Sequence, residues 1–385
     1  MRIAFVGNGT LMADTYPVPC VGGSIQTWGL ASELAKRGHD VYIIRRNRLN
    51  GKTCVDNVTI VSISFSSIDA WTPHFSYPYF LGTLFSQLYF SKKSINLIEH
   101  IRPDVICLID RFSGFFPSYL NVAKVYIMHV AETFDFYKSH SIYANKLNSI
   151  MFFIKKFAEN KVLSQVDKIV VLNTFIEKYL KKIGYENVYK IPNGIDIPHF
   201  SNTMDNNFVL YAGRFDWNKN VCNLVNVFAQ IHKSYPNYRL YLVGAGPEEK
   251  KIKNLVSERG IQSRVKIFPW LPRNKLMELM SRCSVFVLPS LFEAANPVVV
   301  LEAMASAKPV IARANMGTVD IINHGVNGYL YNNDEELRKY LEKLLSDDNL
   351  RGKIGCNARR VVEREYAFSK IADKYEELFY NTLLK

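Results

Sequence analysis

Cationic and acidic side chains follow the ends of strand-like segments in the second half of the chain. Tyr211-Ala212-Gly213-Arg214 ends a predicted strand, and Lys219 lies five residues further on, where the next helix is expected to begin. Two fixed cations beside the free N–H groups of a helix N-terminus would suit the charge of a diphosphate. A lone arginine and lysine in such positions are, however, more commonly solvated surface cations.

The segment 289–305 holds the densest group of such features. A strand is predicted to end at Ser290, and a helix opened by Pro297 carries Glu302 among apolar residues. A carboxylate in apolar surroundings is costly unless another group bonds it. The hydroxyl groups of a ribose would satisfy it, and so would a neighbouring backbone or side-chain group.

Glycines mark two turns in the first half. Gly22-Gly23 precede Ser24, which opens a predicted helix over 24–37, and indicate either a phosphate-binding helix N-terminus or a flexible loop with a serine cap. Gly7-x-Gly9 lacks the third glycine of a dinucleotide fingerprint, and the second strand ends in Arg45-Arg46 rather than in an acidic residue. An NADP-dependent oxidoreductase using those arginines stays open as an alternative, beside a tight turn next to surface charge.

Short apolar runs alternate with longer amphipathic segments, which predicts α/β structure with parallel sheets and helices on both faces. The pattern pauses near Ile191-Pro192-Asn193-Gly194-Ile195-Asp196 and then restarts. We therefore expect two doubly wound domains, 1–197 and 198–367, and a last helix over 368–385 that caps its own domain or crosses back to the first. The strands are expected at 3–7, 41–45, 58–64, 105–109, 125–129, 169–172, 208–213, 240–244, 265–268, 285–289 and 310–313.

Composition narrows the class of protein. The chain has 385 residues, of which 48% are hydrophobic and 22% charged, so it is globular rather than disordered. The formal net charge of +13 favours anionic partners, and no recognised motif supports a nucleic acid. The six cysteines form no C-x-x-C pair, so neither a zinc site nor a disulfide framework is expected. No apolar stretch suits a signal peptide or a membrane span, and we expect a cytoplasmic protein, free or peripheral on the inner face of the membrane.

Taken together, the motifs resemble those of the retaining glycosyltransferases of family 4 (glycosyltransferase group 1). The resemblance covers essentially the whole chain and rests on Gly22-Gly23, 191–196, Gly213-Arg214…Lys219, 243–247 and Glu293…Glu302-Ala303-Met304. It implies the GT-B fold, two Rossmann-like domains facing across a cleft. It also implies a hexosyltransferase-type enzyme that moves a sugar from a nucleotide-diphosphate sugar to a glycan, lipid-linked or small-molecule acceptor with retention of configuration. No metal or other cofactor is expected, because no convincing Asp-x-Asp motif is present.

The resemblance assigns roles by position. Arg214 and Lys219 resemble the pair that neutralises the donor diphosphate, Glu302 the carboxylate that bonds the ribose, and Glu293 the one near the hydroxyls of the transferred sugar. His129, at the end of a first-domain strand, is similar to the family histidine beside the donor sugar, although a lone histidine is more often structural.

Further positions are implied to line the donor. The resemblance implies that backbone N–H groups of Asn296, Pro297 and Val298 face sugar or phosphate. It also implies that Trp270 and Leu271 lie beside the nucleobase, and that Gly22 and Gly23 close over phosphate or acceptor. One departure stands out: the eight residues between Glu293 and Glu302 are one more than the family pattern, and the extra residue is expected in Ala294-Ala295.

Aromatic residues and lysines gather in the first half. The stretch Trp71–Ser94 is rich in aromatic residues and contains Lys92-Lys93, and lysines are frequent between 138 and 190. Such a mixture suits the interface of an anionic membrane, and it equally suits core helices with solvated lysines. With the net charge, it favours a lipid-linked or membrane-proximal acceptor. A sugar-nucleotide epimerase and a non-catalytic nucleotide-sugar binding subunit remain alternatives.

Overall fold

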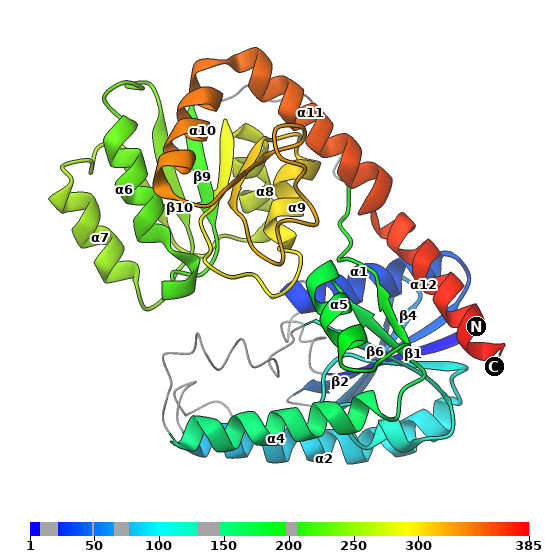
Figure 1. Cartoon of the computed structure of the whole chain (residues 1–385). Coiled ribbons are helices and arrows are strands. Elements are labelled where there is room, and N and C mark those ends of the chain that lie inside the picture. The colour runs from blue at the N-terminus through cyan, green and yellow to red at the C-terminus, as the bar shows by residue number, and fades with distance from the viewer. Residues whose placement is uncertain (8–21, 48–49, 65–76, 130–145, 198–205, 385) are drawn as a thin grey trace. The chain divides into compact units, whose positions relative to one another are not determined.

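The computed structural model describes residues 1–7, 22–47, 50–64, 77–129, 146–197 and 206–384 (Figure 1). The chain divides into two compact units. Unit 1 comprises Met1–Gly194 and Phe368–Lys385, and unit 2 comprises Ile195–Ala367. Each unit has its own sheet and its own hydrophobic core, and the two are described separately below.

Unit 1 is built on a mainly parallel sheet. Its described strands are β1 (Arg2–Val6), β2 (Asp40–Asn47), β3 (Gly51–Val55), β4 (Val58–Ser64), β5 (Val105–Leu108), β6 (Ala123–Met128), β7 (Lys168–Val171) and β8 (Val188–Lys190). They lie in the order β3-β4-β2-β1-β5-β6-β7-β8, and β3 pairs with β4 in the antiparallel direction. The strands β5 and β7, each flanked by a strand on both sides, are buried at every residue, as expected for parallel strands covered on both faces.

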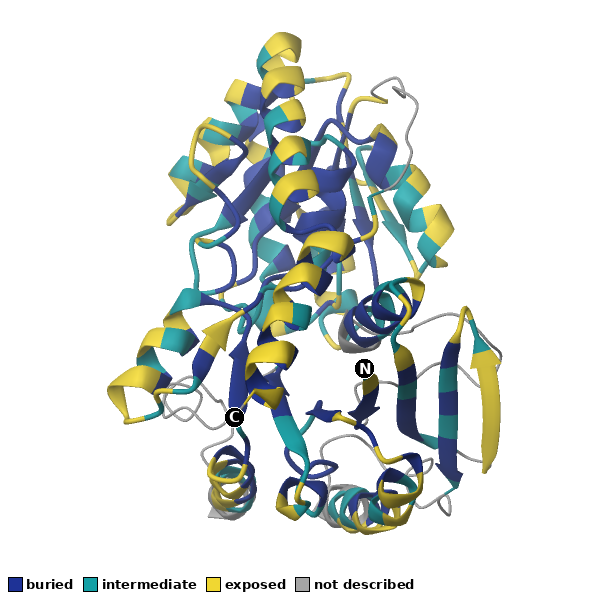
Figure 2. Cartoon of the chain, turned by 90° about the vertical axis from the view of Figure 1, so that its right-hand side faces the viewer, coloured by how far each residue is buried: buried dark blue, intermediate teal, exposed yellow. Residues whose placement is uncertain are grey.

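Helices cover both faces of this sheet. One face carries α1 (Gly22–Lys36) and α12 (Phe368–Leu383), and the other carries α2 (Tyr77–Ile101), α4 (Lys146–Leu163) and α5 (Thr174–Lys182). Alternate residues of β1 supply the two cores: Ile3 and Phe5 pack with α1 and α12, whereas Ala4 and Val6 pack in the cluster that includes α2 and α4. Figures 1 and 2 show α2 and α4 in one layer beneath the sheet.

Close packing holds the start of α12 where the chain returns to unit 1. The ring of Phe368, at the start of α12, lies so close to Gly29 and Gly194 that a Cβ atom at either glycine would overlap it. Gln26, on α1, donates from Nε2 to the carbonyl of Gly194 (2.9 Å) and accepts from its N–H (2.7 Å). These contacts fix α12 and the end of the first segment against α1.

Unit 2 repeats the parallel plan. Its described strands are β9 (Phe208–Ala212), β10 (Arg239–Val243), β11 (Val265–Phe268), β12 (Val285–Leu288), β13 (Val310–Arg313) and β14 (Tyr329–Tyr331), in the order β11-β10-β9-β12-β13-β14. Its helices are η4 (Trp217–Lys219, 3-10), α6 (Val221–Ile231), α7 (Glu249–Glu258), α8 (Arg273–Arg282), α9 (Val298–Ala305), α10 (Asp334–Ser346) and α11 (Asp348–Glu365). All strand pairs are parallel, so the loops that follow β9, β11, β12 and β13 emerge at one edge of the sheet. Ligands of such sheets bind at that edge.

Candidate active site

The loops after β9 and β12 bring together two of the predicted donor-binding residues. Lys219, the last residue of η4, donates from Nζ to Glu293 Oε1 at 2.5 Å, and both side chains are largely buried. The backbone supports this contact, because the N–H of Leu291 donates to the carbonyl of Asn218 at 2.8 Å. The sequence reasoning gave Lys219 and Glu293 separate roles, and the structure makes them one ion pair.

Arg214 lies just after β9 and is more exposed. Its Nη2 atom contacts Asp216 Oδ2 at 2.7 Å, and 65% of its side chain is accessible. Asp216 precedes η4, so the two cations of the predicted diphosphate site stand on one short loop with an acidic residue between them. An incoming anion would compete with Asp216 for the guanidinium of Arg214.

Glu302 occupies the buried face of α9 and is 5% exposed. Burial raises the pKa of its carboxyl, and the guanidinium of Arg273 opposes that rise. Arg273 Nη1 lies 2.5 Å from Glu302 Oε1. Of the two possibilities left by the sequence, the structure shows a neighbouring side chain on one oxygen of this carboxylate. Arg273, the first residue of α8, was missed by the sequence reasoning, because spacing along the chain does not show which cation reaches Glu302.

The loop from β12 to α9 contains the extra residue and rests on the loop after β13. Asn315 Nδ2 donates to the carbonyl of Ser290 at 3.1 Å, and Asn296 Nδ2 donates to the carbonyl of Gly317 at 3.4 Å. A Cβ atom at Gly317 would overlap the carbonyl of Ala295 and crowd Glu293. The absence of a side chain at Gly317 is therefore what lets the longer loop lie against its neighbour.

One predicted role needs correction at the start of α9. Proline has no backbone N–H, so Pro297 cannot donate to sugar or phosphate. It is instead the N-cap residue, with φ −69°, and its carbonyl accepts from the N–H of Val300 at 3.0 Å. Val298 is the first residue of α9, and the first N–H groups of a helix have no partner within the helix. Val298 and the preceding Asn296 remain candidates for donation.

Trp270 and Leu271 follow β11 and play different parts. Trp270 is 56% exposed at the ligand-binding edge, so its ring can stack on a planar group. Leu271 is partly buried and packs against the core of unit 2. It therefore anchors the turn that presents Trp270.

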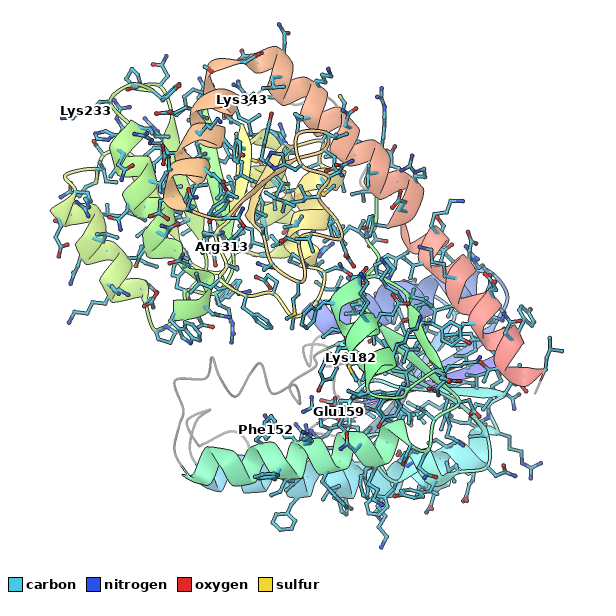
Figure 3. The ribbon with its side chains drawn as sticks, viewed as in Figure 1. Phe152, Glu159, Lys182, Lys233, Arg313 and Lys343 are labelled. Carbon is cyan, nitrogen blue, oxygen red and sulfur yellow. The ribbon has the colours of Figure 1, made fainter. Side chains whose placement is uncertain are left out.

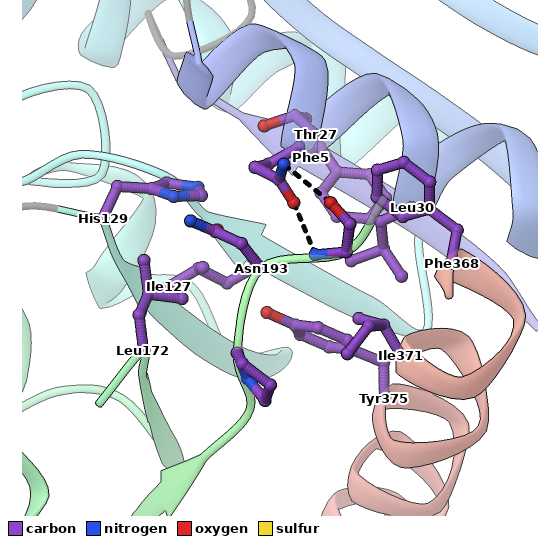
Figure 4. Close-up of a pocket in the computed structure, with 13 residues that line it drawn as sticks. Phe5, Thr27, Leu30, Ile127, His129, Leu172, Asn193, Phe368, Ile371 and Tyr375 are labelled. Carbon is purple, nitrogen blue, oxygen red and sulfur yellow. Dashed lines mark hydrogen bonds between the residues drawn. The ribbon is translucent and has the colours of Figure 1, made fainter. Parts of the chain in front are cut away.

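In unit 1, His129 follows β6 and lines a pocket with Gln26, Thr27 and Asn193 (Figure 4). Figure 4 shows His129 and Asn193 pointing toward each other. Burial lowers the pKa of His129 to about 4, against the opposing influence of the Asp110 carboxylate. The imidazole is therefore neutral at pH 7 and can exchange hydrogen bonds with a sugar without contributing charge. Asn193 and Gln26 are further polar residues of this pocket to which the sequence reasoning gave no role.

The glycine pair of the first half begins a helix. Gly22 and Gly23 are the first residues of α1, so the helix starts two residues before Ser24. The preceding residues, including Cys20 and Val21, lie outside the described part of the chain.

The arginines of the oxidoreductase alternative are bonded within unit 1. Arg45 is 9% exposed and donates from Nε to Ser62 Oγ at 3.1 Å, and Arg46 donates to Ser86 on α2. Both arginines of that alternative are thus bonded to serine hydroxyls of unit 1. Gly9, the second glycine on which it was built, lies outside the described residues.

Membrane-spanning helices and metal-binding clusters are both absent from the part of the chain that the structure describes. None of the helices in the described ranges is long and apolar enough to cross a membrane. Within the same ranges, no group of three or more His, Cys, Asp or Glu side chains is placed to hold a metal ion.

Two family descriptions match the chain in succession. Residues 22–198 match the family described as Glycosyltransferase Family 4, and residues 196–361 match Glycosyl transferases group 1. Among named relatives, an uncharacterized glycosyltransferase of Haemophilus influenzae is 29% identical over 75% of this chain and 80% of its own length. The alpha-monoglucosyldiacylglycerol synthase of Acholeplasma laidlawii is 23% identical over 97% of each chain.

Solved structures show the same fold over nearly the whole chain. Sucrose-phosphate synthase from Thermosynechococcus elongatus aligns with a TM-score of 0.80 at 21% identity, covering 99% of this chain and 98% of its own. Anabaena HepE in complex with UDP and glucose aligns with a TM-score of 0.72 at 19% identity, covering 99% of each. The predicted GT-B fold with two Rossmann-like domains is thus confirmed. The chain belongs to the group 1, family 4 glycosyltransferases and is an enzyme of the hexosyltransferase type, as the sequence predicted.

Proposed function

We propose that this enzyme transfers a hexose from a nucleotide-diphosphate sugar to an acceptor hydroxyl with retention of anomeric configuration. The observation that carries the proposal is the Lys219–Glu293 pair at 2.5 Å, at the sheet edge where Arg214 and Glu302 also lie. One edge thus offers cations for a diphosphate and carboxylates for sugar hydroxyls. No metal or other cofactor enters the proposal.

The leaving group carries most of the charge that develops during transfer. As the bond between the anomeric carbon and the phosphate oxygen breaks, Arg214, Lys219 and the first N–H groups of α9 stabilise the released nucleoside diphosphate. The acceptor oxygen attacks from the same face and gives its proton to a phosphate oxygen, so no dedicated base is needed. Lys219 touches both a phosphate and Glu293 in this arrangement, and it links the charge of the leaving group to the carboxylate that orients the sugar.

The donor nucleoside is assigned to Glu302 and Trp270. Glu302 accepts from the ribose hydroxyls while Arg273 holds its other side, and the exposed ring of Trp270 stacks on the base. The likeness to HepE, a structure that contains UDP and glucose, makes a uridine nucleotide the first donor to test.

The acceptor is proposed to be a glycan or a lipid-linked molecule met at the inner face of the membrane. The relative from Acholeplasma laidlawii is named for a glucosyldiacylglycerol product, which supports a lipid among the candidates. The alternative of a free small-molecule acceptor predicts turnover that is independent of membranes.

A thermal-shift screen with UDP, UDP-glucose, UDP-galactose, GDP-mannose, ADP-glucose and dTDP-glucose tests the donor. A bound donor at about 100 times its Kd stabilises the native state by about 2.7 kcal/mol and raises the unfolding midpoint. Arg214→Ala and Lys219→Ala should lose most of that shift. Lys253→Ala, which removes an exposed cation paired with Glu249 on α7, should keep it. A shift that persists in both site variants would overturn the assignment, and NMR of the product anomer would test retention.

A further inference from the structure

Four large aromatic side chains stand exposed on the helical layer beneath the sheet of unit 1. Phe85 and Tyr89 of α2 are 67% and 50% exposed, and Phe153 and Phe157 of α4 are 62% and 59% exposed. Within each pair the residues are four apart, so they lie next to each other on one side of the helix. Leaving rings of this size in water forgoes the favourable burial that each could provide.

Helical geometry places these rings away from the sheet. At about 100° per residue, Phe153 and Phe157 lie about 120° and 160° around α4 from Glu159, which is fully buried. Figure 3 shows Glu159 on the side of α4 that faces the sheet. The rings therefore serve no packing role in the core of unit 1.

The same calculation applies to α2. Phe85 and Tyr89 lie about 140° and 100° around the helix from the fully buried Phe90. We call the solvent-facing sides of these two helices, with Phe85, Tyr89, Phe153 and Phe157, the α2–α4 face. Figures 1 and 2 show both helices in the layer that carries it.

Lysines accompany the rings on both helices. Lys93 Nζ lies 5.6 Å from the ring centroid of Tyr89, and Lys161 Nζ lies 5.7 Å from that of Phe157. Lys92 is exposed and lies about 160° around α2 from Phe90, so it adds a third cation to this face. The acidic residues in the described parts of α2 and α4 are Glu99 and the buried Glu159, so lysines outnumber carboxylates on the α2–α4 face and its charge is positive.

We propose that the α2–α4 face docks on an anionic lipid bilayer, with the four rings at the boundary between headgroups and acyl chains and the lysines against lipid phosphates. Aromatic rings and lysines interleaved along helices of 25 and 18 residues match the pattern of helices that lie in a membrane interface. A second copy of this chain fits poorly, because two lysine-rich faces would repel each other.

The position of the face within unit 1 links it to the acceptor. Helix α2 follows β4 and α4 follows β6, and both strands run parallel to β1, so both helices begin at the ligand-binding edge of the sheet. Phe85 and Phe153 lie about 12 Å and about 10 Å along their helices from the first residues of α2 and α4, at 1.5 Å per residue. His129 follows β6 at the same edge. This link to the acceptor rests on the proposed function, whereas the docking itself does not.

Vesicle co-sedimentation of the full chain tests the proposal. Vesicles of phosphatidylcholine with about one third phosphatidylglycerol should bind the protein at low salt, and pure phosphatidylcholine vesicles should bind it much more weakly. Replacing all four rings of the α2–α4 face by Ser should lower the partition coefficient at least about tenfold. Replacing Lys92, Lys93 and Lys161 by Gln should remove most of the dependence on salt and on anionic lipid.

A matched control lies on the opposite face of the same sheet. Tyr380→Ser with Lys370→Gln and Lys374→Gln removes one exposed ring and two lysines from α12, and it should bind vesicles as the wild type does. The proposal is overturned if this control loses as much binding as the ring variant, or if the ring variant binds normally. It is also overturned if the wild type ignores anionic vesicles at low salt, or if the face variants change only the oligomeric state in sedimentation velocity or only the binding of RNA.

The thermal shift with UDP, measured on every variant, separates this inference from the donor assignment. The face variants should keep the response of the wild type, because their changed residues are solvent-facing and outside the donor site. A wild type that binds anionic vesicles but shows no response to any nucleotide would remove the proposed donor and leave the docking surface standing.

Discussion

The contact between Arg273 and Glu302 makes a sharp prediction for donor binding. Arg273→Gln removes a guanidinium that lies 2.5 Å from a carboxylate buried to 5% exposure. The remaining carboxylate has lost a charged partner in apolar surroundings, where an uncompensated charge is costly. If Glu302 bonds the donor ribose, its orientation and its charge both depend on Arg273.

The size of the effect follows from the kind of bond. Hydrogen bonds to charged groups contribute about 1.5–3 kcal/mol, and the 31% exposure of the Arg273 side chain favours the lower end. A loss of about 1.4 kcal/mol corresponds to a tenfold change in affinity. We therefore expect the Kd for UDP near pH 7.5 to rise about tenfold in the Gln variant and less in Arg273→Lys.

The pH dependence has a definite sign. Burial raises the pKa of Glu302 and Arg273 opposes the rise, so removing Arg273 raises that pKa further. Binding that requires the ionised carboxylate weakens as the pH falls through this pKa, and in Arg273→Gln the weakening should begin at a higher pH. Because the folded state then favours protonated Glu302, the variant should also lose stability relative to the wild type as the pH rises.

Isothermal titration calorimetry with UDP between about pH 5 and pH 8 measures both effects. Lys275→Gln is the control, because it removes an exposed cation of the same helix that contacts Glu278 instead. In a protein that already carries Glu302→Gln, adding Arg273→Gln should weaken UDP binding little further, because Arg273 acts on the donor through the Glu302 carboxylate. Identical pH profiles for wild type and Arg273→Gln would refute the reasoning.

Three further predictions concern packing, titration and competition. Gly29→Ala should destabilise the protein by about 1–3 kcal/mol, because the added Cβ would overlap the ring of Phe368. Gly352→Ala, in open space within a helix, should be neutral or stabilising by up to about 1 kcal/mol. Urea unfolding measures the free energy of unfolding of both variants. Burial lowers the pKa of His129 to about 4, so this residue contributes at most about 3 kcal/mol of stability, which is present above about pH 6.5 and lost toward pH 4. The unfolding midpoint of His129→Gln should therefore fall less than that of the wild type over this pH range. Asp216→Asn should tighten UDP binding several-fold in calorimetry by freeing Arg214, and weaker binding would show that Asp216 positions the guanidinium instead.

The sequence predicted best those strands that are buried on both faces. The runs at 105–109 and 285–289 are continuous apolar segments, and they form β5 and β12 with one residue fewer at the end. β3 was missed because it is an exposed edge strand without apolar alternation, and β8 and β14 were missed because three residues carry too little pattern.

Three helices were missed although their start signals are present. Asn173 caps α5 by accepting from the N–H of Ile176 at 2.9 Å, and Asn333 and Asp347 cap α10 and α11 in the same way. These caps can be recognised in the sequence, because Asn and Asp before an amphipathic run are common N-caps.

The candidate site, like the fold, was predicted only in part from the sequence. Arg214, Lys219, Glu293 and Glu302 could be placed at one sheet edge, because the carboxyl ends of parallel strands meet there. Their partners could not be predicted, since the contact of Arg273 with Glu302 depends on how α8 and α9 pack, and that of Lys219 with Glu293 depends on the shape of a loop.

These contacts show how the loop accommodates the extra residue between Glu293 and Glu302. Upstream of Ala294-Ala295, the loop is held where Leu291 bonds Asn218 and Glu293 bonds Lys219, and downstream Asn296 bonds Gly317. A residue added between two fixed points can be absorbed locally, and the lack of a side chain at Gly317 lets the loop lie against its neighbour. The insertion therefore leaves Glu293 in contact with Lys219, one of the two cations proposed to bind the diphosphate. Each glutamate instead has its own cation, Lys219 for Glu293 and Arg273 for Glu302, so the orientation of the sugar and that of the ribose should respond independently to substitution.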